Sequence, residues 1–191
     1  MRWFVLLLIG LAGCTPTTGL KQVDSMAALH VSRPVMQFSL AGRMSVRTPD
    51  QSYSGTLSWT RQAGEDTLLL SGPLGQGAAE IHRHDGRVLL KSADGSEIAE
   101  ESEEQLMQRL LGLRLPLDGM VYWFSGLPRP GIGFQAGVDP QGRVGSLDQD
   151  GWHIEYSKYR RYGESWRPGR IVAKQGAALE FRFVLDQWEA L

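Results

Sequence analysis

The sequence predicts a mainly β protein with a helical insert, built as one domain around a single antiparallel sheet. Three observations carry this prediction. Apolar and polar residues alternate with a period of two in many segments, as they do in half-buried strands. Asp-Gly pairs, which favour tight hairpin turns, separate several of these segments. Beyond residue 34 the period becomes helical only between residues 102 and 126, so no strand–helix–strand alternation is present.

The strands follow from this alternation in chain order. The clearest segment is Phe38-Ser-Leu-Ala-Gly-Arg-Met-Ser-Val46, in which every second residue near the start is large and apolar. A later segment from Trp152 to Tyr159 places Trp152, Ile154 and Tyr156 on one face. On the same criteria we expect nine to eleven strands, at residues 38–46, 53–60, 67–71, 76–83, 87–91, 97–100, 144–149, 152–159, 170–174 and 178–185.

The helical insert has recognisable start and stop signals. Ser102 and Gln105 form a capping box before an apolar helical face, and Pro116 opens a second short helix that ends near Gly126. Another short helix is expected over residues 21–29. A sheet of this length can curl, and helices across its mouth leave either a solid core or an apolar cavity. Composition alone favours the solid core.

The N-terminus has the layout of a bacterial lipoprotein signal. Arg2 precedes a short apolar run, and Leu11-Ala12-Gly13-Cys14 resembles the lipobox, in which the cysteine is lipidated and cleavage falls before it. Cys14 is the only cysteine of the 191 residues, so the folded part has no disulfide. We therefore divide the chain into residues 1–13 as signal peptide, 14–33 as lipidated tether with a short helix, and 34–191 as the folded domain.

The residue after Cys14 bears on the location of the protein. In the lipoproteins that the N-terminus resembles, Asp at that place commonly retains the protein at the inner membrane. Here the residue is Thr15. We therefore expect a lipid-anchored protein of the outer membrane, facing the periplasm.

Several classes of function find no support in the residues. The formal net charge is −1 and no basic stripe occurs, so a nucleic-acid partner is not expected. His82 and His84 share a strand face but have no companion cluster, so we interpret them as exposed hairpin residues and expect no metal. The Gly131-Ile132-Gly133 pattern follows prolines and no strand, and no Gly-x-Ser-x-Gly elbow occurs. We expect neither a cofactor nor an enzyme.

Most of the chain after the lipobox resembles the outer-membrane lipoprotein receptor LolB family. The resemblance rests on the order and spacing of several short stretches, and it is weakest over residues 129–142. These stretches are residues 38–46, Ser54-Gly-Thr-Leu-Ser-Trp59, Gly72-Pro-Leu-Gly-Gln76, Leu115-Pro116, Tyr122-Trp-Phe-Ser-Gly-Leu-Pro128 and Gln149-Asp-Gly-Trp-His-Ile-Glu-Tyr156, with Tyr159 and Trp188.

The resemblance implies a fold and a task. The fold is an open, incomplete antiparallel β-barrel of about 11 strands with helices covering the opening, close to that of the periplasmic carrier LolA. The task is to accept acylated lipoproteins from that carrier and insert them into outer-membrane lipid; we expect a monomer. The apolar face then becomes the wall of an acyl-chain cavity. The candidate lining residues are Phe38, Leu40, Met44, Tyr53, Leu57, Trp59, Trp123, Trp152, Ile154, Tyr156, Phe181 and Phe183.

One apolar residue is expected outside the core. Leu74 lies between Pro73 and Gly75 in the turn sequence Ser71-Gly-Pro-Leu-Gly-Gln-Gly77, which favours a tight surface loop. Leu74 either folds back onto the rim of the barrel or enters the membrane during delivery of cargo, and we expect the second.

Two other classes stay open at the level of sequence. A structural or assembly-type outer-membrane lipoprotein would share the lipobox and the β-rich body but have a solid core. An esterase-like enzyme would need a nucleophile beside a base, which no motif provides.

Overall fold

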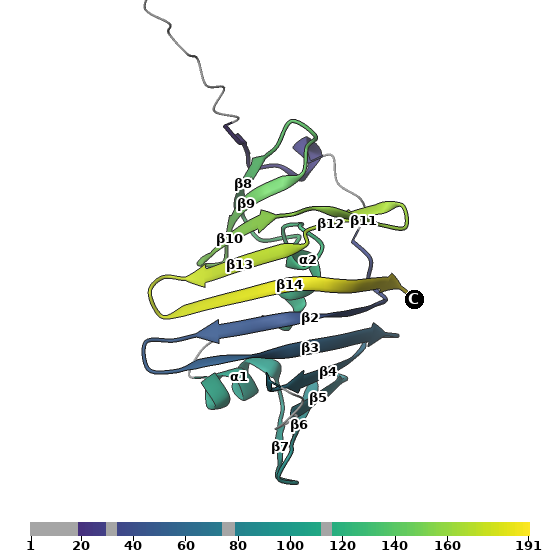
Figure 1. Ribbon diagram of the computed structural model, residues 1–191, viewed down its shortest axis with the longest axis vertical. Helices are drawn as coiled ribbons and strands as arrows, with labels where there is room; N and C mark the ends of the chain where they lie inside the picture. The colour runs from purple at the N-terminus through teal and green to yellow at the C-terminus, as the bar shows by residue number, and fades with distance from the viewer. Residues whose placement is uncertain (1–18, 30–33, 74–78, 112–115) are drawn as a thin grey trace, which may run out of the picture.

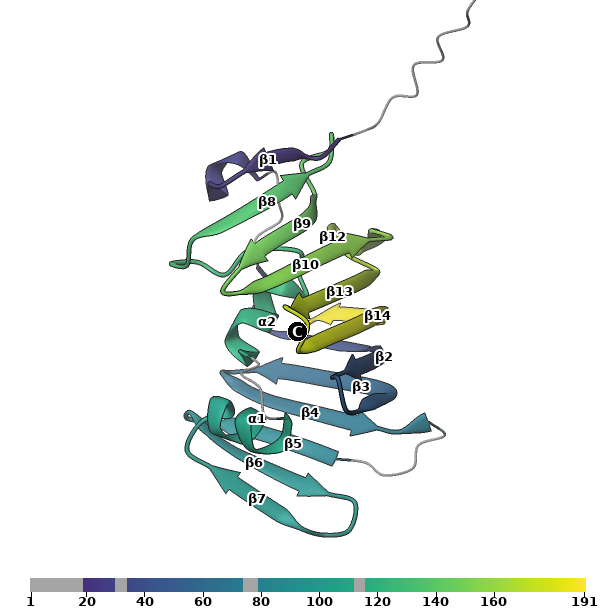
Figure 2. The ribbon, with the colours of Figure 1, turned by 90° about the vertical axis from the view of Figure 1, so that its left-hand side faces the viewer.

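The computed structural model describes residues 19–29, 34–73, 79–111 and 116–191, and these form one large sheet with helices on one side (Figures 1 and 2). Cys14 and Leu74 lie outside the described residues. The sheet has 12 strands, and every neighbouring pair is antiparallel. It ends in two separate edge strands, β1 and β7, so it is open. The fold class predicted from the sequence is confirmed.

The strands follow the chain closely in space, as expected for a meander of hairpins. From one edge of the sheet to the other, they are β1 (Lys21–Val23), β8 (Phe134–Val138), β9 (Val144–Gln149), β10 (Trp152–Ser157), β13 (Arg170–Gln175), β14 (Leu179–Ala190), β2 (Phe38–Arg47), β3 (Ser52–Gln62), β4 (Glu65–Ser71), β5 (Ala79–His84), β6 (Arg87–Ser92) and β7 (Glu97–Glu100). A separate two-stranded ribbon is formed by β11 (Arg160–Tyr162) and β12 (Ser165–Arg167).

Three elements outside the strands complete the described fold. They are a single 3-10 turn at Met26–Ala28, α1 (Glu103–Leu111) and α2 (Leu117–Trp123). Figure 2 shows α1 and α2 on the same side of the sheet, with α2 near its middle strands. As predicted, Ser102 caps α1, because its Oγ accepts a hydrogen bond from the backbone N–H of Gln105 at 3.2 Å.

The three longest strands, β14, β2 and β3, lie together at the centre and fix the position of the apolar face. Cross-strand partners share a face, so the pairs Leu40–Trp59 and Phe183–Met44 point to the same side. The register of β14 against β2 shifts between Leu185 and Gln187. This bulge restores the alternation, since Trp188 then pairs with Leu40 and joins the face that Leu185 also occupies.

The N-terminal expectation was wrong in part. Residues 21–29 were predicted to be helical, but Lys21–Val23 is the strand β1 and only the 3-10 turn at Met26–Ala28 is helical. The reason is that β8 would otherwise expose unpaired backbone groups at the sheet edge, and β1 covers them. The folded domain therefore begins before residue 34.

Three further strands, β8, β11 and β12, were not predicted. The strand β8 lies within residues 129–142, where Pro and Gly on both sides conceal a strand of 5 residues. The predicted strand from Trp152 to Tyr159 ends at Ser157, because Lys158 adopts a positive φ of 56° and turns the chain toward the ribbon of β11 and β12.

Gly42 on β2 gives a test of the central packing. A methyl group at this position would overlap the carbonyl oxygen of Val184 and the ring of Phe183, both on the neighbouring strand. We expect Gly42→Ala to lower the free energy of unfolding by about 2 kcal/mol or more, measured by urea denaturation.

Gly133 is the matched control for that substitution. Its φ is not positive and nothing lies within 4 Å of an added methyl group, so Gly133→Ala should leave stability nearly unchanged. Equal effects of the two substitutions would contradict the close approach of β14 to Gly42.

Candidate functional site

The most distinctive surface of the sheet is a continuous apolar face rich in large aromatic side chains. Five strands supply it because each alternates buried and exposed positions. Its buried members are Phe38, Leu40 and Met44 of β2, Leu57 and Trp59 of β3, Trp152, Ile154 and Tyr156 of β10, Ile171 and Ala173 of β13, and Phe181, Phe183 and Leu185 of β14. We refer to these residues as the aromatic face.

The helix α2 lies on the aromatic face and fills it with its own side chains. The ring of Phe124, directly after α2, lies 4.7 Å from the ring of Phe183, centre to centre, and 5.7 Å from that of Trp59. Near the C-terminal end of α2, Trp123 meets Trp152 at 5.8 Å. These edge-to-face and tilted contacts are the arrangements that aromatic pairs favour. The helix is therefore a plug and not a loose cover.

Little empty space remains beneath α2. The cavity there has a volume of about 20 Å³ and is lined only by apolar side chains, those of Met120, Trp123, Phe124, Trp152, Ile154, Ile171, Ala173 and Phe181. This volume is close to the minimum for one water molecule and far below the several hundred Å³ of typical ligand pockets. In this form the site is closed.

Most of the residues predicted to line the site lie on the aromatic face. Of the twelve, Trp123, Trp152, Ile154 and Phe181 border the remaining cavity. Tyr53 differs, because it is 41% exposed and lies opposite Val46, close to the turn that joins β2 and β3. The other predicted residues are buried in the aromatic face. Among the described residues α2 occupies this face, and the acyl-chain cavity that the resemblance implied stays a prediction.

The C-terminal end of α2 is fixed by the buried amide of Gln149 on β9. Its Oε1 accepts hydrogen bonds from Trp123 Nε1 at 3.0 Å and from the backbone N–H of Arg129 at 2.8 Å. Its Nε2 donates to the carbonyl oxygens of Arg129 and Ile132. Two accepted and two donated bonds satisfy the whole amide group, which fixes its orientation. The sequence did not indicate this role, because glutamine is usually exposed.

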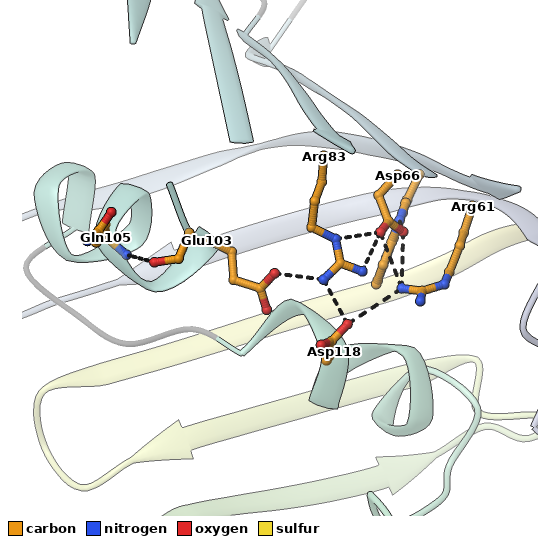
Figure 3. Close-up of polar contacts among 8 residues, drawn as sticks. Arg61, Asp66, Arg83, Glu103, Gln105 and Asp118 are labelled. Atoms are coloured by element: carbon orange, nitrogen blue, oxygen red, sulfur yellow. Dashed lines mark hydrogen bonds and ion pairs between the residues drawn. The ribbon is translucent and has the colours of Figure 1, made fainter. Parts of the chain in front are cut away.

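The N-terminal end of α2 is held by a cluster of charged side chains, the ionic cluster (Figure 3). At its centre, Arg83 of β5 donates from Nε to Asp66 of β4 at 2.8 Å. Its Nη1 lies 2.7 Å from Asp118 of α2 and 2.7 Å from Glu103 of α1. Arg61 of β3 also contacts Asp66, at 3.2 Å. The ionic cluster therefore joins both helices to three strands.

The ionic cluster also reaches the aromatic face. The fully buried carboxylate of Asp66 accepts a hydrogen bond from Trp59 Nε1 at 2.8 Å. Burial opposes the charge of Arg83, but hydrogen bonds to Asp118 and Glu103 and the nearby charge of Asp66 raise its pKa overall. Arg83 is therefore a permanent cation between the sheet and α2.

Arg83 was not predicted as a site residue, although it lies between the two histidines discussed above. His82 and His84 lie on the other face of β5 and contact Glu80 and Glu65. Arg83 is only 8% exposed and shares the face of the buried Ile81. The alternation along β5 was the signal that could have identified it, because a charged residue in register with a core position needs a buried partner.

A second and larger depression lies at the ends of the hairpins, outside the aromatic face. Its volume is about 740 Å³, and it is open to solvent. Charged side chains border it, and those of Asp148 and His153 contact each other at 2.7 Å, so it cannot shield an apolar chain from water. The residues that line it are Gly133, Phe134, Gln135, Asp148, Gln149, Asp150, Gly151, Trp152, His153, Lys174 and Gly176.

Within the described residues, no group of three or more His, Cys, Asp or Glu side chains is placed to hold a metal ion. The helices of the described ranges are also too short or too polar for any of them to cross a membrane.

Comparison with known proteins decides the family. The family described as Outer membrane lipoprotein LolB matches residues 36–188. This chain belongs to the LolB family. An outer-membrane lipoprotein LolB of Pseudomonas paraeruginosa is 36% identical over 152 residues, which are 80% of this chain and 74% of that protein. The LolB protein of Nitrosococcus oceani is 32% identical over 99% of both chains.

A solved structure supports the same fold at much lower sequence similarity. A LolA superfamily protein of Nitrosomonas europaea superimposes with a TM-score of 0.55, at 11% identity, over 88% of this chain and 94% of that one. This chain and that protein therefore share a fold.

The ionic cluster makes a prediction about stability. Arg83→Met leaves the buried carboxylate of Asp66 with fewer partners, so we expect the free energy of unfolding to fall by about 3–5 kcal/mol. The measurement is urea denaturation followed by tryptophan fluorescence.

The control is Arg109→Met, which removes a single exposed ion pair with Glu100 at 2.8 Å and should change stability by about 1 kcal/mol or less. A small effect at Arg83, like that at Arg109, would show that the ionic cluster does not hold the fold together.

Proposed function

We propose that this protein accepts acylated lipoproteins from a periplasmic LolA-like carrier onto the aromatic face and inserts them into the outer membrane. Membership of the LolB family supports the general role, since its relatives are named as outer-membrane lipoproteins. The single observation that carries the rest is the way α2 fills the aromatic face. Met120, Trp123 and Phe124 occupy the space that an acyl chain would need.

A plug of this kind makes exchange possible without exposing apolar surface. Each CH₂ group moved from water into an apolar site contributes about 0.8 kcal/mol, so an acyl chain cannot cross the periplasm unshielded. When the chain enters, it replaces the contacts of α2, and the net free energy is only the difference between two apolar packings. A small difference is enough for a receptor. If the receptor binds the acyl chain about 1.4 kcal/mol more tightly than the carrier does, the equilibrium favours the receptor tenfold.

Polar contacts at both ends of α2 set how easily it leaves. Asp118 is half exposed, and its pair with Arg83 can be exchanged for water at small cost. The bond between Trp123 and Gln149 is buried and is harder to replace. We therefore propose that α2 opens from its Asp118 end and pivots about the Gln149 end.

Two expected residues complete the proposed function. Lipidated Cys14 anchors the chain in the outer membrane, and Leu74, in the loop between β4 and β5, enters the lipid and aligns the mouth of the site with it. No cofactor is needed, because affinity alone moves the chain.

A second candidate is a structural outer-membrane lipoprotein. The observation that favours it is the cavity of about 20 Å³, because such a protein needs only a solid core. The two candidates differ in whether α2 can leave the aromatic face.

A transfer experiment decides between them. The chain from Thr15 to Leu191, which keeps every described residue, is mixed with a LolA-like carrier loaded with a triacylated lipoprotein. Cargo that co-purifies with the chain supports the receptor. Cargo that stays on the carrier supports the structural protein.

The Asp118 contact predicts the rate of opening. Asp118→Asn weakens the tie between α2 and Arg83, and because Asp118 is half exposed and Arg83 keeps Asp66 and Glu103 as partners, we expect a loss of about 0.5–1 kcal/mol. A fluorescent fatty-acyl probe should therefore enter roughly two to five times faster in stopped-flow measurements.

Asp186→Asn is the control for that variant, since it removes an ion pair with Arg43, also partly exposed, on the central strands. Equal rates in the two variants would mean that the Asp118 contact does not limit opening.

Leu74 predicts a separation of the two steps of transfer. A charge at a residue that enters lipid opposes insertion, so Leu74→Glu should leave uptake of cargo from the carrier nearly unchanged. Insertion of that cargo into liposomes should fall at least tenfold. Equal loss of uptake would place Leu74 in the core or the site, and normal insertion would show that it plays no part in delivery.

A further inference from the structure

A second buried arginine, Arg167 of β12, lacks the partners that Arg83 has. Its residue is 1% exposed. Nη1 donates to the backbone carbonyl of Trp166 at 3.1 Å. Nε and Nη2 are buried and find no hydrogen-bond partner among the described residues. Burial lowers the pKa of Arg167, although the nearby Tyr159 acts in the opposite direction.

Such a group needs an explanation, because an uncompensated buried charge is costly. The ring of Trp188 lies 4.9 Å from the guanidinium carbon and contributes a cation–π contact. That contact covers one flat side of the group and leaves its edge of N–H donors unsatisfied. No carboxylate of the described ranges forms an ion pair with Arg167.

The free edge has the geometry that recognises an anion. Elsewhere in this chain, Arg43 uses the same two nitrogens, Nε and Nη2, to grip both oxygens of Asp186 at 3.1 and 3.0 Å. Arginine pairs in this bidentate manner with carboxylates and phosphates. The unused edge of Arg167 therefore matches a group with two adjacent anionic oxygens.

A second unsatisfied donor lies on the aromatic face. The hydroxyl of Tyr156 is buried and has no hydrogen-bond partner within the described part of the chain. Burial and the nearby Tyr159 both raise the pKa of Tyr156, so it is a neutral O–H donor. Tyr159 itself is satisfied, since its hydroxyl donates to the carbonyl of Val144 at 2.7 Å. The hydroxyl of Tyr159 and the ring of Pro168, the residue after Arg167, both lie beside Gly126, so Tyr159 lies in the neighbourhood of Arg167.

Arg167 lies at one end of the aromatic face. Trp188, which contacts Arg167, stacks on Phe38 at 4.9 Å between ring centres. Phe38 in turn meets Trp59 at 5.1 Å, and Trp59 meets Phe124 of the plug at 5.7 Å. A continuous path of aromatic rings therefore runs from beneath α2 to the guanidinium. Gly126, just after α2, packs against Tyr159 and Pro168 beside this end.

We propose that Arg167 is the headgroup site for an anionic amphiphile, whose carboxylate or phosphate pairs with Nε and Nη2 while its acyl chain lies along the aromatic face. Tyr156 donates a further hydrogen bond to the same headgroup. The proposal rests on the proposed function in one respect, that α2 must leave the aromatic face to admit the chain. A fatty acid and an anionic phospholipid supply the same headgroup chemistry.

The test uses four probes that separate charge from chain length. Laurate and dodecyl phosphate have an anionic headgroup and an apolar chain. Dodecanol has the apolar chain without the charge, and acetate has the charge without the chain. Binding to the chain from Thr15 to Leu191 is measured by isothermal titration calorimetry. We expect laurate or dodecyl phosphate, or both, to bind roughly ten to a hundred times more tightly than dodecanol, as charge-assisted hydrogen bonds permit. Which of the two binds distinguishes a fatty acid from a phospholipid.

Arg167→Met should remove this preference and leave dodecanol binding unchanged. The control is Arg160→Met, because Arg160 is exposed and lies opposite Arg167 in the same ribbon. That control should keep the preference. Without ligand, Arg167→Met should melt at or above the temperature of the wild type, since it removes a buried unpaired charge. If Arg167→Met does not fold, Arg167→Lys and Tyr156→Phe replace it, and each should reduce the preference.

The contrary outcomes are distinct. Equal binding of laurate, dodecyl phosphate and dodecanol by the wild type would overturn the proposal. A preference for the anionic probes over dodecanol that persists in Arg167→Met would overturn it as well. Binding of acetate as tight as that of laurate would overturn the role of the chain. Lipoprotein transfer is scored separately, so a chain that binds laurate but takes no cargo would contradict the proposed function alone.

Discussion

The packing of α2 into the aromatic face is the contact on which the rest of the structure depends. The sheet is open, so its face of phenylalanine and tryptophan rings would otherwise meet water. Residues close together in the chain, from Met120 to Phe124, bury the apolar surface of that face. Burial of this surface is favourable because it removes apolar groups from water. A short segment can leave as a unit, whereas a core shared among many strands cannot. The same contact therefore stabilises the fold and provides a way to open it.

The two ends of α2 are held by chemically different contacts, and the difference gives the motion a direction. At Asp118 the contact is an ion pair between a half-exposed carboxylate and a buried guanidinium that has two other acidic partners. At Trp123 the partner is a buried neutral amide with all four of its hydrogen bonds made. Breaking that network leaves buried polar groups without partners, which costs more than losing an exposed ion pair. The end at Gln149 is therefore the hinge of the opening that we propose.

Most of the sheet could be predicted from the sequence, but the polar interior could not. Strand alternation placed Phe38, Trp59, Trp152 and Phe183 on one face because the period of a strand depends only on local geometry. Cross-strand register is not local. It brings Asp66 beside Arg83, 17 residues away in sequence, and turns an apparently exposed charge into a buried one.

The short strands could not be predicted from the sequence for a related reason. Strands such as β1 exist only because a neighbouring edge needs a partner, and a segment of 3 residues carries no period of its own. How far α2 fills the aromatic face also depends on packing in three dimensions, so the closed form could not be read from the chain.

The contrast between the two buried arginines explains why Arg167 matters. The fold brings three carboxylates from three elements to Arg83, and their negative charges compensate its positive charge. They are Asp66, Glu103 and Asp118. At Arg167 it supplies a tryptophan ring and one backbone carbonyl, and among the described residues no acid. The ribbon that carries Arg167 is separate from the main sheet, and the bulge in β14 is what turns Trp188 toward the aromatic face. A leucine at position 167 would fill such a place without the cost of desolvating a charge. The unpaired charge is therefore a burden on stability, and a ligand with an anionic head and an apolar chain would relieve it.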